Sequence, residues 1–343
     1  MNELKLDNLK NLSWFPFSDE PVVKGGFYLP QLSNPQILLP EESCDSKWHL
    51  FVHSWLGLHH FISDSGIAWE PKNLIEVRAH SPFIYKENEN YYLLYEKHDK
   101  KIPFIGMKYN YRENEKNTST SSIDMCSSTD LITWSKPRTL ITSKQVVFAD
   151  DYLSSPRISR PQLCKIGRKY RLYFGASHLV LPDSKQKVSR YLSYAECDTI
   201  DGLYQCNEKT PLLEPSGDDE FCNLGVGSFR LLQFQDGFVA FNCPATWNSE
   251  KNRSETNLFI MFSEDGLKWE RQEKPVLVPA ERGWASRYIM GCDVHYKEKE
   301  DCWYCYFCAN GNKRFFMKQE SIGLLIGNTA ELRGAPKNFS YNN

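Results

Sequence analysis

The chain has 343 residues, of which 41% are hydrophobic, 14% aromatic and 24% charged, and its formal net charge is −2. Charges of both signs are mixed along the sequence, which argues against nucleic acid or an anionic membrane as a partner. There is no run of 18 or more apolar residues, and the start, MNELKLDNLKNLSWF, lacks the basic and apolar regions of a signal peptide. We therefore expect a soluble, cytoplasmic protein.

A two-stranded unit recurs five times along the chain. Its clearest copy is SRPQLCKIGRKYRLYFGAS, in which a strand containing Pro161 is followed by a turn at Gly167 and an aromatic strand from Tyr170 to Gly175. Alternating residues on both sides of a glycine turn are typical of a β-hairpin. The five units begin near residues 34, 81, 160, 227 and 291. The sequence therefore predicts five copies of one hairpin.

Two further elements follow the hairpin in phase. A turn ending in Trp69, Trp134 or Trp269 occupies 63–69, 128–134 and 263–269, with a degenerate copy at 198–204. Asp and Gly suit tight turns and Trp packs between sheets, so we interpret these motifs as structural. A proline-led apolar strand follows at 71–77, 137–141, 211–213 and 275–278. Proline is tolerated on edge strands, which makes this the outer strand of each unit.

One extra proline-led copy predicts the topology. Pro21-Val22-Val23 precedes the first hairpin, whereas the last unit has no such strand of its own. The N-terminal copy can therefore supply the outer strand of the last sheet and close a ring. We predict one all-β domain over 1–343, a five-bladed β-propeller, with 1–20 as a leader and 21–33 as the closing strand and lead-in.

Eleven cysteines, an odd number placed mainly in strand patterns, agree with a reducing compartment. Cys302, Cys305 and Cys308 form a C-x-x-C-x-x-C run that has metal-site spacing. Residues three apart face opposite sides of a strand, however, so neighbouring pairs do not converge on one ion. We expect free buried thiols, no metal site and no required cofactor.

The loops that lead into the inner strands of a propeller gather at one end of its axis, and we expect the binding site at this mouth. The residues expected to face it from the inner strands are Asn34, Gln36, His80, Ser81, Arg160, Gln162 and Asp293. Asp293 is the one carboxylate expected to point at the axis. The alternative is that it ties an inner strand to a loop by hydrogen bonds. Arg230 is one step out of register and is expected to face a neighbouring sheet.

Acidic loops precede two of the predicted inner strands. Asp150 and Asp151 lie before the third unit, and Asp218, Asp219 and Glu220 lie before the fourth. Adjacent carboxylates confined in a cleft raise one pKa, which would suit an acid catalyst, whereas solvated carboxylates do not. Asp150, Asp151 and Glu220 are therefore candidates for catalysis, with a solvated surface loop as the alternative.

Imidazole, indole and guanidinium groups supply the remaining candidates. His59 and His60 are adjacent in a predicted strand and face opposite ways, so a metal triad with His53 is not expected, but His53 or Trp55 can contact a ligand. The other candidates at the mouth are Arg157, Arg160, Arg287, His80 and Trp284. Such a cationic patch would match carboxylate or phosphate oxygens, and ordinary pairing with nearby Asp residues is the alternative.

The units NPQI, HSPFIYKENENYYLLYE and SRPQLCKIGRKYRLYFGAS, together with SSTDLITW and SEDGLKWE, resemble the five-bladed propeller glycosidases of glycoside hydrolase families 32, 43, 62, 68 and 130. The resemblance covers about 21–327. It implies a sugar at the axial mouth, catalytic carboxylates on inner strands and, in some members, a structural cation in the axial channel. Here Asn34, Ser81 and Arg160 occupy the corresponding positions, and none of them can act as the required acid or base.

Three functions are compatible with this pattern. In the first, the protein cleaves or transfers a glycosyl group with a relocated pair, Asp293 with one of Asp150, Asp151 or Glu220. The second resembles the family 130 phosphorylases, with Arg160, Arg287 and His80 around phosphate. In the third, a non-catalytic propeller binds a glycan or a protein partner. A carbohydrate partner is expected in the first two, and the oligomeric state is not predicted.

Overall fold

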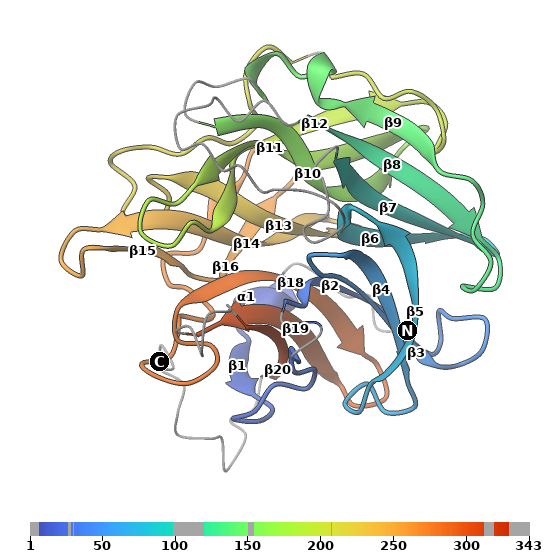
Figure 1. Cartoon of the computed structure of the whole chain (residues 1–343), viewed down its shortest axis with the longest axis horizontal. Coiled ribbons are helices and arrows are strands. Elements are labelled where there is room, and N and C mark those ends of the chain that lie inside the picture. Colours follow the sequence, from blue (N-terminus) through green and yellow to red (C-terminus); the bar gives the residue numbers. More distant parts are fainter. Residues whose placement is uncertain are drawn as a thin grey trace, which may run out of the picture.

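The computed structural model describes residues 7–26, 29, 31–98, 120–149, 154–206, 208–311 and 319–328. The chain folds into five antiparallel sheets arranged around one axis, which is the predicted five-bladed β-propeller (Figure 1). Each inner strand contacts the inner strands of both neighbouring blades, so the ring is closed. The one α-helix of the described residues, α1 (Asp7–Lys10), has four residues, and no helix there could cross a membrane.

Blades 1 and 2 have the four strands that the sequence predicts. Blade 1 consists of β2 (Ser33–Leu38), β3 (Trp48–His53), β4 (Gly57–Ser63) and β5 (Glu70–Val77). Blade 2 consists of β6 (Ala79–Glu87), β7 (Asn90–His98), β8 (Ser121–Ser128) and β9 (Arg138–Thr142), and two short 3-10 helices, η1 (Ser143–Gln145) and η2 (Val147–Ala149), follow it. The proline-led segments at 71–77 and 137–141 thus lie in or at the outer strands.

Blades 3 and 4 have longer inner hairpins. Blade 3 consists of β10 (Ser154–Ile166), β11 (Lys169–Val180) and β12 (Lys187–Cys197). Blade 4 consists of β13 (Gly225–Phe234), β14 (Gly237–Asn248), β16 (Phe259–Ser263) and β17 (Glu270–Arg271), and β15 (Arg253–Thr256) pairs with the far end of β14. The proline-led segments form only isolated bridges here, Leu213 with Leu192 and Leu277 with Leu258.

Blade 5 is completed by the N-terminal part of the chain. It consists of β18 (Tyr288–Lys297), β19 (Cys302–Asn310), β20 (Glu320–Asn328) and β1 (Ser13–Pro16). β1 pairs with β20 from Ser13 opposite Asn328 to Pro16 opposite Leu325. Val23 adds an isolated antiparallel bridge to Ile322. The closing strand therefore lies within the expected leader, and the expected segment contributes one bridge.

The core lies between the sheets, as the aromatic composition suggests. Five clusters of buried side chains each join two adjacent blades; the cluster of Phe51, Leu58, Leu93 and Tyr95, for example, joins blades 1 and 2. The tryptophan of each turn motif packs in these interfaces. Its ring meets a ring of the neighbouring blade or sheet, such as Trp134 against Phe51 at 6.2 Å.

The turn motifs are structural. Asp130 Oδ1 accepts hydrogen bonds from the backbone N–H groups of Ile132 and Thr133 at 2.9 and 2.7 Å. Asp265 is bonded in the same way to the two residues that follow its turn. Gly66 has a φ of 75°, and its carbonyl accepts a hydrogen bond from Tyr306 Oη of blade 5 at 2.9 Å. Each of these turns therefore also helps to fix two blades together.

The N-terminal closure makes a testable contribution to stability. Trp14 on β1 is 9% exposed, and its ring meets Phe241 of blade 4 edge-on at 5.7 Å. We expect Trp14→Ala to lower the free energy of unfolding by about 3–5 kcal/mol, because a large buried side chain is lost from the closing interface. Urea denaturation followed by tryptophan fluorescence and far-UV circular dichroism measures this change.

Phe17→Ala is the matched control, since Phe17 is three residues away and 46% exposed. It should change the free energy of unfolding by no more than about 0.5 kcal/mol. Equal effects of the two variants would show that β1 is not part of the closure.

Candidate functional site

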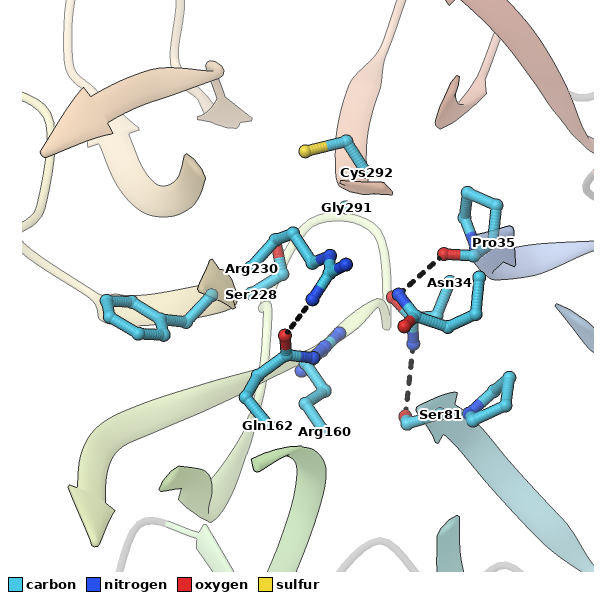
Figure 2. Close-up of a pocket in the computed structure, with 12 residues that line it drawn as sticks. Asn34, Pro35, Ser81, Arg160, Gln162, Ser228, Arg230, Gly291 and Cys292 are labelled. Carbon is cyan, nitrogen blue, oxygen red and sulfur yellow. Dashed lines mark hydrogen bonds between the residues drawn. The ribbon is translucent and has the colours of Figure 1, made fainter. Parts of the chain in front are cut away.

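A narrow pocket lies on the axis at the ends where the inner strands begin (Figure 2). Its volume of about 20 Å³ accommodates a water molecule or one small polar group, but not a sugar ring. Its lining comes from all five blades: Asn34, Pro35, Gln36, Ser81, Pro82, Arg160, Gln162, Ser228, Phe229, Arg230, Gly291 and Cys292. Within the described residues, this lining contains amide, hydroxyl, thiol and guanidinium groups but no carboxylate.

A β-bulge near the start of each inner strand turns the chain at the mouth. The strand registers slip between Ser33 and Gln36, and at the corresponding steps of the other four inner strands. The first bulge residues in blades 1 to 3, Asn34, Ser81 and Arg160, have φ angles of 50°, 53° and 53°. This left-handed conformation is uncommon for residues other than glycine and costs free energy. These three residues therefore hold strained positions at the rim of the pocket.

Short hydrogen bonds link the rim of the pocket. Asn34 Nδ2 donates to Ser81 Oγ at 3.0 Å, a bond that Figure 2 shows between blades 1 and 2. The Ser81 backbone N–H donates to His53 Nδ1 at 3.1 Å. Arg160 Nη1 donates to Ser189 Oγ at 3.0 Å. Four of the residues expected at the mouth, with Gln36 and Gln162, are thus brought together.

Asp293 lies at the floor and does not line the pocket. Its side chain is fully buried in the gap between blades 5 and 1, where Oδ2 accepts hydrogen bonds from Ile37 N at 2.5 Å and His295 Nε2 at 2.9 Å. Oδ1 forms an ion pair with Arg230. Burial would raise the Asp293 pKa, but Arg230 and His295 outweigh it and hold the pKa at about 2. Asp293 therefore stays ionised, and the geometry matches its alternative interpretation as a hydrogen-bonded tie.

Arg230 reaches the axis, in contrast to the expectation that it faces a neighbouring sheet. The register of β13 slips between Gly225 and Ser228, so Ser228 and Arg230, two residues apart, both line the pocket. Arg230 Nη1 donates to Gln162 Oε1 at 3.1 Å, as Figure 2 shows, and its guanidinium lies 5.3 Å from the centre of the Phe83 ring. The bulge shifts the alternation by one residue, which the aligned sequence units did not reveal.

A group of imidazoles lies beside the pocket on blades 1 and 2. The ring centres of His53 and His80 are 4.7 Å apart, and those of His80 and His98 are 4.5 Å apart. Burial, together with the positive charge of Arg160, lowers the pKa of His53 to about 3. Burial and the neighbouring imidazoles also place the His80 pKa well below its usual value. At neutral pH both rings are therefore uncharged, and each can donate and accept a hydrogen bond.

A buried ion pair stands next to these imidazoles. Arg157 binds Glu96 through two nitrogens, Nε at 2.7 Å and Nη2, and the two residues are 3% and 1% exposed. His178 Nε2 lies 2.7 Å from Ser159 Oγ on the same side of the mouth. Arg157 is thus paired, although with a glutamate rather than the nearby Asp residues.

Glu96, His98 and His178 were not among the expected site residues. All three lie near the ends of second strands, β7 and β11. Because a hairpin returns its second strand to the end where the first strand starts, the position of these residues in the repeat could have revealed them. They were missed because the expected residues came from the lead-in loops and the inner strands.

The hairpin between β11 and β12 covers one side of the mouth. Its tip residue Asp183 accepts a hydrogen bond from Ser254 N of blade 4 at 3.0 Å and pairs with Arg287 of blade 5. Gln186 Nε2 donates to Glu320 Oε1 of blade 5 at 3.1 Å. A ligand must therefore enter from the side of blades 1, 2 and 3.

Several expected site residues lie elsewhere. Arg287 pairs with Asp183, and Trp284 Nε1 donates to the Asp19 carbonyl while its ring stacks on Phe307. Glu220 is exposed on the loop before blade 4, and Trp55 is partly exposed in the turn after β3. Asp150 and Asp151 lie outside the described residues. His59 and His60 have separate partners, Ser54 and His49.

The axial residues do not fit a structural cation. The Asp293 carboxylate is already neutralised by the fixed guanidinium of Arg230. Among the described residues, no three His, Cys, Asp or Glu side chains are placed to hold a metal ion. Cys302, Cys305 and Cys308 are free and buried along β19.

Comparison with known proteins identifies the fold. No family model and no curated protein matches the chain. A solved complex of BT0996 and RGII aligns over 94% of each protein, with a TM-score of 0.63 and 12% identity. An exo-1,5-alpha-L-arabinanase from a bovine ruminal metagenomic library aligns over 87% of this chain and 93% of its own, with a TM-score of 0.55 and 12% identity.

A Bombyx mori GH32 beta-fructofuranosidase aligns over 94% of this chain and 65% of its own, also with a TM-score of 0.55 and 12% identity. The chain therefore has the five-bladed propeller fold found in glycoside hydrolases of families 43 and 32. At these identities the similarity establishes the fold and not the reaction.

The Asp293 ion pair predicts how stability depends on pH. The pKa of Asp293 is about 2 in the folded state, below the usual 3.8. The paired carboxylate therefore stabilises the fold above about pH 4, and this contribution, roughly 2 kcal/mol, is lost as the pH falls towards 2. Asp293→Asn should lose this contribution and leave Arg230 without a counter-charge. We expect a loss of about 3–5 kcal/mol at pH 7.

Urea denaturation at several pH values tests this expectation, with Asp64→Asn as the control, because Asp64 is an exposed turn residue whose ion pair with Lys47 lies at the surface. A variant at Asp293 that is as stable as the control at pH 7 would show that the floor does not depend on this ion pair.

Proposed function

We propose that this protein is a carbohydrate-binding propeller that holds a glycosyl group at its axial mouth and does not hydrolyse it. The observation that supports this is the lining of the pocket. Asn34, Ser81 and Arg160 occupy the rim, where the resembling glycosidases imply carboxylates, and no described lining residue has a carboxylate. These groups can hydrogen-bond to sugar hydroxyls, but they do not form an acid–base pair.

The carboxylates near the axis are poorly suited to glycoside hydrolysis. That reaction usually needs one carboxyl group to protonate the leaving oxygen and a second, about 5 to 10 Å away, to attack or to activate water. Asp293 is buried, ionised and bonded through both oxygens. Glu96 is buried against Arg157. Neither is free to transfer a proton to a ligand at the mouth.

Phosphorolysis is the second candidate function. Arg160 is a cation in the pocket lining, and the uncharged imidazole of His80 lies beside the mouth. Both groups suit a phosphate ion next to a bound sugar. Arg287, the third residue expected in such a cluster, pairs with Asp183 instead. This candidate therefore has weaker support than binding alone.

Two measurements on the purified protein test the proposal. In the first, sugar release is measured from a panel of aryl glycosides and oligosaccharides, with and without phosphate. In the second, a glycan array followed by isothermal titration calorimetry measures binding. We expect binding of at least one glycan and no sugar release. Asn34→Leu should weaken that binding about tenfold or more, because it removes the donor that bridges blades 1 and 2 at the rim.

Asn73→Leu is the matched control, since Asn73 is an exposed residue of β5 on the outer edge of blade 1, and it should bind normally. Release that requires phosphate would replace the proposal with phosphorolysis. Release without phosphate would establish a hydrolase with relocated carboxylates. If no glycan binds, carbohydrate recognition is excluded.

A further inference from the structure

Arg160 has no counter-charge among the residues that the structure describes. The other two arginines near the axis each have a carboxylate partner, Arg157 with Glu96 and Arg230 with Asp293. Within the described chain, the only hydrogen-bond partner of the Arg160 side chain is Ser189 Oγ, at 3.0 Å from Nη1, and the buried Nε atom has none. No described carboxylate lies within ion-pair distance of its guanidinium.

Such a residue is costly for the fold. Burial of the Arg160 guanidinium lowers its pKa, yet an arginine keeps its proton in a protein, so its charge must be tolerated. Its backbone also has a left-handed φ of 53°. Strain and an uncompensated charge at one residue indicate a functional role, because neither improves packing.

The surroundings of Arg160 indicate what its partner must be. The two nearest carboxylates, Glu96 and Glu320, have partners of their own: Glu96 pairs with Arg157, and Glu320 accepts hydrogen bonds from Gln186 and Asn310. The pocket that Arg160 lines holds about 20 Å³, and Asn34 and Ser81 contribute further polar groups to it. Figure 2 shows these groups around one small space. That space suits a single charged substituent and excludes a sugar ring.

We propose that the protein binds an acidic sugar and that Arg160 receives its oxyanion, a carboxylate or a phosphate ester, inside the axial pocket. This inference rests on the proposed function and adds the class of ligand. The sugar ring lies above the pocket, on the open side formed by blades 1, 2 and 3. There, the uncharged imidazoles of His53 and His80 face the ring hydroxyls, and Nε2 of His80 has no partner among the described residues.

Calorimetric titration at constant ionic strength tests the ligand class. The probes are D-glucuronate, D-galacturonate, glucose 6-phosphate, glucose, galactose and inorganic phosphate. We expect at least one acidic sugar to bind tenfold or more tightly than its neutral counterpart. Arg160→Met should remove this preference and leave the affinity for the neutral sugar within about twofold, because only the charged contact is lost. Arg160→Lys should retain part of the preference.

Arg138→Met is the control variant, since Arg138 forms an exposed ion pair with Asp201, and it should bind every probe as the wild type does. A uronate preference identifies a carboxylate, and a glucose 6-phosphate preference identifies a phosphate ester. Binding of inorganic phosphate alone would overturn the inference in favour of phosphorolysis.

The melting temperature supplies a second readout that separates binding from a structural role. We expect Arg160→Met to melt at or above the wild-type temperature, because a buried charge without a partner is removed. Arg157→Met should melt at a lower temperature, because it leaves Glu96 buried and unpaired. A lower melting temperature for Arg160→Met together with an unchanged acidic preference would overturn the inference. If neutral and acidic sugars bind equally, the inference fails while the proposed function stands, whereas failure of all glycans to bind removes both.

Discussion

The ion pair between Arg230 and Asp293 is the interaction on which the centre of the ring depends. Arg230 extends from blade 4 and contacts Gln162 of blade 3 and the Phe83 ring of blade 2. Asp293 belongs to blade 5 and accepts the backbone N–H of Ile37 in blade 1. One pair of opposite charges therefore connects all five inner strands. A propeller has no single hydrophobic centre, so polar contacts at its axis must do what side-chain packing does between the blades.

This arrangement separates two tasks along the axis. At the floor, both charges are matched, and the Asp293 carboxylate is fully hydrogen-bonded, so the floor is suited to holding the blades together. At the rim, Asn34, Ser81 and Arg160 occupy strained bulges, and Arg160 has no counter-charge within the described part of the chain. The fold thus satisfies its own charges at depth and presents the Arg160 charge where a ligand can arrive. The hairpin that carries Asp183 restricts the direction of that arrival.

The sequence was sufficient for the architecture because the repeat states the same local rules five times. Hairpin turns, the Asp turns and interface tryptophans recur in phase, and the aromatic strands form the interfaces between blades. The closing strand was misplaced because β1 is only four residues long, and no turn signal distinguishes Ser13–Pro16 from its surroundings. The proline-led segment at Val23 has the stronger signal and forms only a bridge.

The site was harder to predict because a bulge changes which residues face the axis. Simple alternation placed Asp293 in the pocket and Arg230 outside it, and the structure shows the reverse. Lead-in loops were expected to bring Trp284 and Arg287 to the mouth, yet both are held by contacts at its outer side. Neither the slip of a register nor the partner of a long side chain can be read from one repeat alone, since both depend on the neighbouring blade. The bulges also explain how one fold can have different chemistry at the same place. In blades 1 to 3 the bulge sets the left-handed backbone, and the following proline fixes the next φ angle, so the side chain at the rim is held there whatever its identity. Replacing a carboxylate at such a position alters the ligand without disturbing the ring, because the blades are joined below the rim by Arg230 and Asp293. A change of function at the mouth is therefore compatible with full retention of the fold.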